Sequence, residues 1–195
     1  MPNSTQEILS LPFIRKSFED AGCLAFCQRI EQLRFYDQLT SAFATKLRRD
    51  KVTIERIEFT LSREFISTMA RLPNTRETWF KKRDIDLQIY NMYLKPPYKT
   101  TPKHVFPFRH LLDKYSPLMR LIMKYFTCEG RYSRLYQYHM RLLMHFTSVK
   151  QLNLPYYLYR SLKKMTEKVQ NMEENNHTSL FHHGLVKIVV CHQFI

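Results

Sequence analysis

Apolar residues recur at helical spacing over residues 108–169, the strongest periodic signal in the chain. Apolar side chains three and four positions apart share one helical face, while basic side chains off that face meet water. The first such set is Leu111, Leu112, Tyr115, Leu118, Ile122 and Phe126. Pro117 predicts either a kink in this helix or a helix start, with Ser116 as N-cap and Pro117 in the first turn, and we favour the start.

Two further helices are predicted in the same block. Gly130 ends the first pattern, because glycine readily adopts the left-handed conformation that closes a helix. The second helix has a short connection to the first, which predicts antiparallel neighbours, and its apolar face is Tyr132, Leu135, His139, Leu142, Leu143 and Phe146. The third is predicted to start at Asn153 as cap with Pro155 in the first turn. Its buried stripe is Leu158, Leu162, Met165 and Val169.

Residues 52–59 carry the one β pattern of the chain. Val52 and Ile54 have one parity and Ile57 and Phe59 the other, so a single strand would place these side chains on opposite faces. A turn near Arg56 removes that conflict. The pattern therefore predicts a small two-stranded ribbon supported by helices.

The remaining segments give weaker signals. Residues 1–12 are polar and turn-like, and are predicted to be frayed. Helices are expected from about residue 19 to 30, over 35–47, from Ser62 as N-cap to residue 72, and over 180–192. Residues 74–107 are predicted to be an extended, proline-rich loop with one short helix between 84 and 93. Residues 171–179 are predicted to be a polar linker.

Composition agrees with a mainly α fold. The chain has 195 residues, of which 44% are hydrophobic and 14% aromatic, so it can bury a core. Its three glycines argue against a sandwich or barrel rich in tight turns. We predict a flexible N-terminus over 1–12 and a single helical domain over 13–195. This domain has a central helical block at 108–170, a small two-stranded β element and a long proline-rich loop at 74–107.

Positive charge is concentrated in the middle of the chain. Residues 46–172 hold 26 basic and 10 acidic residues, a net charge of +16, whereas residues 1–45 and 173–195 are each at −1. Such a field attracts polyanions, but a surplus of lysine and arginine also simply makes a soluble surface. Charge alone does not separate these two interpretations.

The chain carries no pattern for membrane insertion or export. No apolar run approaches the roughly 18 residues that span a bilayer, and the first 16 residues lack the basic-then-apolar order of a secretory signal. We expect an intracellular protein, nuclear or cytoplasmic, with no membrane association. Four cysteines without framework spacing are then expected to be reduced and mostly buried.

Candidate chemistry is sparse. Cys23 and Cys27 share a helical face, and histidines flank Cys191, but the paired spacing of a zinc site is missing, so core cysteines are favoured. Asp84 and Asp86 are the one close pair among the aspartates, and a solvated charge cluster is favoured over a two-metal nuclease site. We expect no catalytic residue, metal, cofactor or small-molecule ligand, and a nonenzymatic protein.

Basic and aromatic residues alternate at the starts of the second and third predicted helices. Arginines there can neutralise phosphates while tyrosines stack on unpaired bases. The other interpretation, which we favour, is half-buried tyrosines beside a solvated basic face. The candidate nucleic-acid-binding residues are Arg131, Arg134, Arg160, Lys163, Lys164 and Lys168.

The order of short sequence words resembles one protein family. FYDQL, LSREFISTMARLP, WFKKR, TCEGRYSRLYQYHMRLLMHF, NLPYYLYRSLKKM and LFHHGLVKIVV follow one another over residues 35–192. In this the chain is similar to the plant transposon protein domain family, plant proteins of unknown function associated with transposable elements. The resemblance implies a mobile-element origin in a plant nuclear genome and transfers no catalytic residue.

The expected function is therefore binding. One hypothesis is nucleic-acid binding, or binding of another element-encoded protein, through the basic middle segment. The competing hypothesis is a protein-interaction or structural module whose positive charge is incidental.

Overall fold

The computed structural model describes residues 5–33, 37–54, 56–75, 87–98, 105–127, 133–147, 151–170 and 183–191. Within these ranges the chain is mainly α-helical, as predicted, with ten α-helices and two antiparallel two-stranded sheets. The helices are α1 (Thr5–Ser10), α2 (Pro12–Asp20), α3 (Leu24–Gln32), α4 (Asp37–Lys46), α5 (Arg63–Ala70), α6 (Leu87–Asn91), α7 (Ser116–Phe126), α8 (Gln137–Phe146), α9 (Leu154–Gln170) and α10 (His183–Cys191). The strands are β1 (Lys51–Ile54), β2 (Ile57–Thr60), β3 (Val105–Pro107) and β4 (Arg134–Tyr136).

The segment predicted to be frayed contains a helix. Thr5–Ser10 forms α1, and Leu9 within it is buried. The helix expected from about residue 19 is instead two helices, α2 and α3, separated at Gly22. Gly22 has a φ of 65°, a left-handed conformation that favours glycine and breaks the helical path.

The predicted β ribbon is confirmed. β1 and β2 pair antiparallel, with Val52 opposite Phe59 and Ile54 opposite Ile57. Val52, Ile54 and Phe59 are buried, so both strands turn their apolar parity to the same side. The change of parity in the sequence is the turn at Arg56.

Helix α5 begins as predicted. The Ser62 hydroxyl oxygen accepts a hydrogen bond from the backbone N–H of Phe65 at 3.0 Å, which satisfies one of the free N–H groups of the first turn. Arg71 closes the helix in a left-handed conformation, with φ 54°. Leu72 and Pro73 then follow outside the helix.

In the central block, the first and third helices start where the sequence predicts. α7 starts at Ser116 with Pro117 in its first turn, although Ser116 is the first helical residue and Tyr115 precedes it as N-cap. Leu111 and Leu112 do not belong to this helix, because short 3₁₀ turns precede it. α9 begins at the predicted place.

The start of the second predicted helix is corrected by the structure. Arg134–Tyr136 forms β4, which pairs with β3 from the segment predicted to be a proline-rich loop. Phe106 and Leu135 lie opposite each other in this sheet and both are buried. Burial against a partner distant in sequence outweighs the local helical period, so α8 begins only at Gln137. Arg131, Tyr132 and the predicted break at Gly130 lie outside the described residues.

The remaining predictions concern the loop and the C-terminal region. The short helix expected between 84 and 93 is α6, and the final buried helix is α10, whose Leu185, Ile188 and Val189 are buried. The predicted polar linker at 171–179 lies outside the described residues. So do residues 76–86 and 99–104 of the predicted loop.

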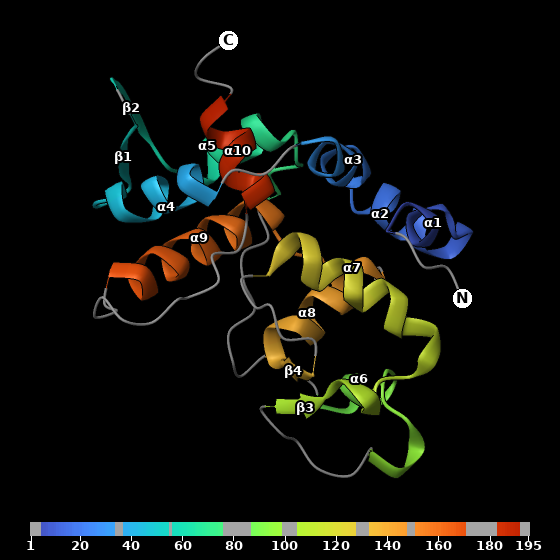
Figure 1. Cartoon of the computed structure of the whole chain (residues 1–195). Coiled ribbons are helices and arrows are strands. Elements are labelled where there is room, and N and C mark those ends of the chain that lie inside the picture. Colours follow the sequence, from blue (N-terminus) through green and yellow to red (C-terminus); the bar gives the residue numbers. More distant parts are fainter. Residues whose placement is uncertain are drawn as a thin grey trace.

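The helices form two groups, one packed around α9 and the other around α7. α9 packs against α4 and α5, and α10 packs against α3, α4 and α5. α7 contacts α8 and α1, and α2 contacts α3 and α8. In Figure 1 the long α9 runs below α4 and α10, and the β1–β2 ribbon extends away from the end of α4. α3 connects the two groups of helices, because it contacts both α2 and α10.

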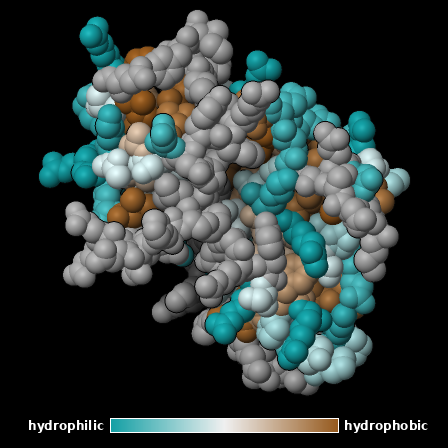
Figure 2. Space-filling view, in the orientation of Figure 1, coloured by the Kyte–Doolittle hydropathy of each residue, from teal (hydrophilic) through white to brown (hydrophobic). Residues whose placement is uncertain are grey.

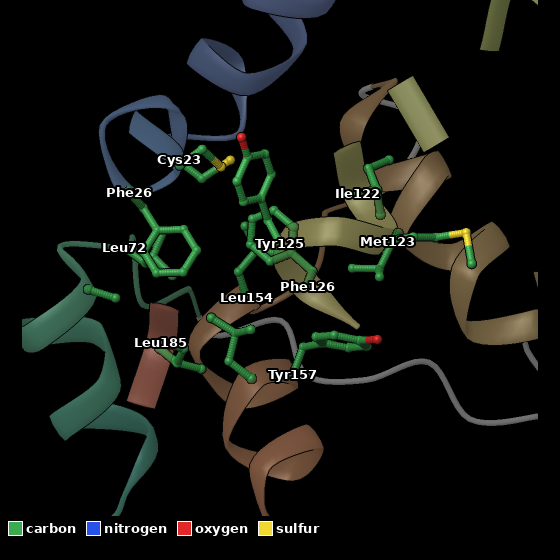
Figure 3. Close-up of a cluster of buried hydrophobic side chains, with 14 of the residues drawn as sticks. Cys23, Phe26, Leu72, Ile122, Met123, Tyr125, Phe126, Leu154, Tyr157 and Leu185 are labelled. Carbon is green, nitrogen blue, oxygen red and sulfur yellow. The ribbon is translucent and has the colours of Figure 1, made fainter. Parts of the chain in front are cut away.

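The buried apolar side chains form one cluster that takes members from every described α-helix. Figure 3 shows a part where helices distant in sequence meet, with Phe26 of α3, Phe126 of α7, Leu154 of α9 and Leu185 of α10 close together. Phe26 and Phe126 have ring centroids 5.7 Å apart. On the molecular surface, brown apolar residues gather in local patches between teal polar residues (Figure 2).

Candidate nucleic-acid interface

Helix α9 is positioned by its first residues and by its buried stripe. The side-chain oxygen of Asn153, which is buried, accepts a hydrogen bond from the backbone N–H of Tyr156 at 2.8 Å, so the predicted N-cap is confirmed. Leu158, Leu162 and Met165 are buried, as expected from their spacing. This orientation leaves Arg160 and Lys164 exposed on its outer side.

Among the candidates whose side chains the structure describes, Lys163 is the one in an ion pair. Its ammonium lies 2.8 Å from the Asp50 carboxylate, and the Tyr159 hydroxyl donates a hydrogen bond to the same carboxylate at 2.9 Å. The bond from Lys163 lowers the pKa of Asp50, and the same contact raises the pKa of Lys163. Lys163 therefore holds α9 to the turn before β1, and much of its charge is already neutralised.

Arg160 and Lys164 directly follow Tyr159 and Lys163, the α9 residues of this contact, and are both exposed. They are one helical turn apart, so their side chains share a face of α9. The Lys164 ammonium lies 5.7 Å from the centroid of the Tyr138 ring, within cation–π range, and so connects α9 to the start of α8. Glu167, also exposed, is the nearest carboxylate along that face.

The rings next to Lys164 are stacked. Tyr136 and Tyr138 have centroids 5.6 Å apart and planes within 4° of parallel, and both are half-buried. Arg134 is exposed two residues before Tyr136 on β4, and alternate residues of a strand point to the same face. We call Arg134, Tyr136, Tyr138, Arg160 and Lys164 the basic–aromatic surface.

The buried side chain of His139 fixes the position of Tyr136 at the start of α8. His139 Nδ1 accepts a hydrogen bond from the Tyr136 N–H at 3.0 Å, which joins the last residue of β4 to the first turn of α8. Burial, with a smaller contribution from the charge of Lys164, lowers the pKa of His139 to about 3. The imidazole is therefore neutral at physiological pH and serves to orient Tyr136.

Not all predicted residues can be placed. Arg131 lies outside the described part of the chain, and the side chain of Lys168 is not described. Lys164 lies over the ring of Tyr138, and Arg134 is two residues before Tyr136 on β4. Arg160 continues that surface along α9, and Lys163 points into the contact with Asp50.

Sequence reasoning missed Asp50, which organises this region. Residues 46–51 are mostly basic, but nothing local shows that their one carboxylate meets Tyr159 and Lys163 of a distant helix. The signal that could have pointed to Asp50 is the short connection at Arg49 and Asp50, which is tight but contains no glycine.

Other candidate chemistry is placed as follows. Cys23 and Cys27 are free, buried thiols, and burial raises the pKa of Cys27. Among the residues described, no group of three or more histidine, cysteine or acidic side chains is placed to hold a metal ion. Asp84 and Asp86 lie outside the described ranges. None of the described helices is long and apolar enough to cross a membrane.

Comparison of the chain with protein-family models, with curated proteins and with solved structures finds no match.

Proposed function

We propose that this chain is a nonenzymatic nucleic-acid-binding protein that uses the basic–aromatic surface, with an origin in a plant transposable element and an intracellular site of action. The observation that carries the proposal is the position of Lys164 over Tyr138, next to the parallel ring of Tyr136. Cations beside stacked aromatic rings suit a phosphate backbone with unpaired bases, because the cations neutralise phosphates and the rings offer stacking area.

The free charges of the surface support the same function. No ion pair joins Arg134, Arg160 or Lys164 to another described residue. Their charges are therefore available to phosphates, in contrast to Lys163. The word-order resemblance to the plant transposon protein domain family agrees with a nucleic-acid context.

The competing proposal is a protein-interaction or structural module whose positive charge is incidental. Two observations favour it. Lys163 is paired with Asp50, and the tyrosines at 136, 138 and 159 are half-buried. Both are expected of a solvated basic face that covers a core. The two proposals differ in their response to salt.

Fluorescence anisotropy of labelled single-stranded and duplex oligonucleotides, over a salt series, tests the proposal. The parent protein is expected to bind with a steep salt dependence and little sequence preference, tighter to the single strand. The variant R160Q/K164Q is expected to lower affinity and to reduce the salt slope by up to about two units. Absence of binding by the parent at low salt would leave the interaction module.

Two further variants control for net charge. R15Q/K16Q removes the same charge from α2, where both residues are exposed and paired with Glu19 and Asp20, and it should leave binding nearly unchanged. E167Q removes the carboxylate next to the surface and should tighten binding. Equal effects of the two double variants would assign binding to the overall charge of the protein and not to this surface.

A further inference from the structure

The connection between α4 and β1 is a two-residue turn with an unusual backbone. The backbone N–H and C=O groups of Arg48 and Lys51 bond to each other in both directions, each at 2.8 Å. The two central residues have positive φ, 47° at Arg49 and 74° at Asp50. Turns of this shape normally take Asn-Gly, because side chains other than glycine are disfavoured at positive φ. Backbone strain of this kind persists only where surrounding contacts hold it.

Three contacts of Asp50 hold the turn. Its carboxylate accepts hydrogen bonds from Tyr159 and Lys163 on α9, and its backbone oxygen accepts one from the N–H of Leu61 at 2.6 Å. Aspartate is among the residues that tolerate the left-handed conformation best. The turn is therefore fixed to α9 by the side chain of one of its own strained residues.

The end of α4 is fixed by two further side chains. The Gln170 amide, at the end of α9, donates to the carbonyl oxygens of Ala44 and Leu47, each at 2.9 Å. The Arg48 guanidinium donates to the carbonyl oxygens of Thr45 and Leu47. These carbonyls lack helical partners of their own, so the contacts stabilise the helix end. Arg48 is occupied in this role.

Arg49 is left as the outward cation of the turn. It is exposed, and no ion pair or hydrogen bond joins its side chain to another described residue. Lys46, also exposed, precedes it at the end of α4. On the other side of the Asp50 contact, Arg160 and Lys164 are neighbours of Tyr159 and Lys163 along α9. Figure 1 shows the end of α4 and the start of β1 beside α9.

We propose that the Arg49 turn and the outer face of α9 form one continuous binding surface for the phosphodiester backbone of nucleic acid, in which Arg49 contacts a phosphate and Asp50 is a positioning residue. The proposal rests on the nucleic-acid-binding function proposed above and extends its surface from α8 and α9 to the α4–β1 connection. Because the turn is held before binding, Arg49 meets the phosphate without a loop having to become ordered.

The first test is R49Q, with R56Q as the matched control. Both arginines are exposed, and Arg56 lies in the turn at the far end of the β1–β2 ribbon, so the two variants change net charge equally. In the anisotropy assay at about 0.1 M salt, R49Q is expected to bind about five- to tenfold more weakly and to lower the salt slope by about one unit. R56Q is expected to bind like the parent.

The second test is a substitution at Asp50 for which two effects predict opposite changes in binding affinity. D50G keeps the positive φ accessible, removes the carboxylate and frees Lys163, so a simple increase in positive charge predicts tighter binding. Loss of the contact with α9 predicts weaker binding, because the turn is no longer fixed to that helix. Weaker binding by a D50G protein with unchanged circular dichroism is the expected result.

The outcomes separate the two proposals. If the parent binds and R160Q/K164Q binds more weakly, but R49Q equals R56Q, the extension to the turn is overturned and the function of α9 stands. Tighter binding by D50G overturns the positioning role of Asp50. If the parent does not bind nucleic acid at all, both proposals fail.

Discussion

The side-chain amide of Asn153 donates a hydrogen bond to the side-chain oxygen of Asn74 at 2.8 Å, and a second one to the backbone oxygen of Thr75. The same side chain caps α9 through Tyr156. One buried residue thus defines the start of the longest described helix and ties to it the segment that follows α5.

Two substitutions at Asn153 separate these roles. N153A removes the cap and the contacts with residues 74 and 75, and is expected to lower the free energy of unfolding by about 2–3 kcal/mol. N153S retains a capping oxygen for the Tyr156 N–H but loses both donations to residues 74 and 75, so a smaller loss is expected. Urea unfolding followed by circular dichroism measures both. Equal stability of N153A and the parent would contradict the assigned cap.

The predicted core positions Leu142, Phe146 and Leu162 are all buried, with at most 1% of each side chain exposed. Replacement of any one of them with alanine is expected to cost about 2–5 kcal/mol, because it removes apolar contacts and leaves a cavity. Thermal unfolding measures the loss. T60A, at an exposed position of β2, is the control and should melt like the parent.

Acidification is expected to destabilise the fold through two buried histidines. Burial lowers the pKa of His145 to about 4 and that of His139 to about 3, against an unfolded value near 6.5. The unfolded chain therefore binds more protons below pH 6.5, and stability falls with pH from there until the folded values are reached. Between pH 7 and 5 each histidine should cost about 2 kcal/mol.

Non-titrating variants check this assignment. H139N/H145N can still accept hydrogen bonds at both positions but binds no proton there, so its stability should change less between pH 7 and 5. Urea unfolding at a series of pH values provides the comparison. An unchanged slope in the double variant would assign the pH dependence to other groups.

The two neighbouring lysines of α9 are expected to behave differently. K164Q should weaken nucleic-acid binding and leave the melting temperature nearly unchanged, because Lys164 is exposed and has no ion pair among the described residues. K163Q breaks the contact with Asp50 and should lower stability by about 0.5–1 kcal/mol, since the pair is partly exposed to solvent. Equal melting temperatures of the two variants would show that the Asp50 contact contributes nothing measurable.

The local signals of the sequence determined a large part of the fold. Ser62, Pro117 and Asn153 mark helix starts because capping and proline geometry depend on a few adjacent residues. The parity switch between Ile54 and Ile57 located the ribbon turn for the same reason, since side-chain alternation is a local property of a strand.

Tertiary structure decided what depends on partners distant in sequence. Leu135 fits a helical stripe as well as a strand, and only its position opposite Phe106 selects the strand. Lys163 and Lys164 are equivalent in sequence, yet one is neutralised by Asp50 and the other lies over Tyr138. Local periodicity states which side of a helix is buried, but the position of a distant carboxylate or ring follows only from how the helices pack. That packing determines which cations remain free to bind.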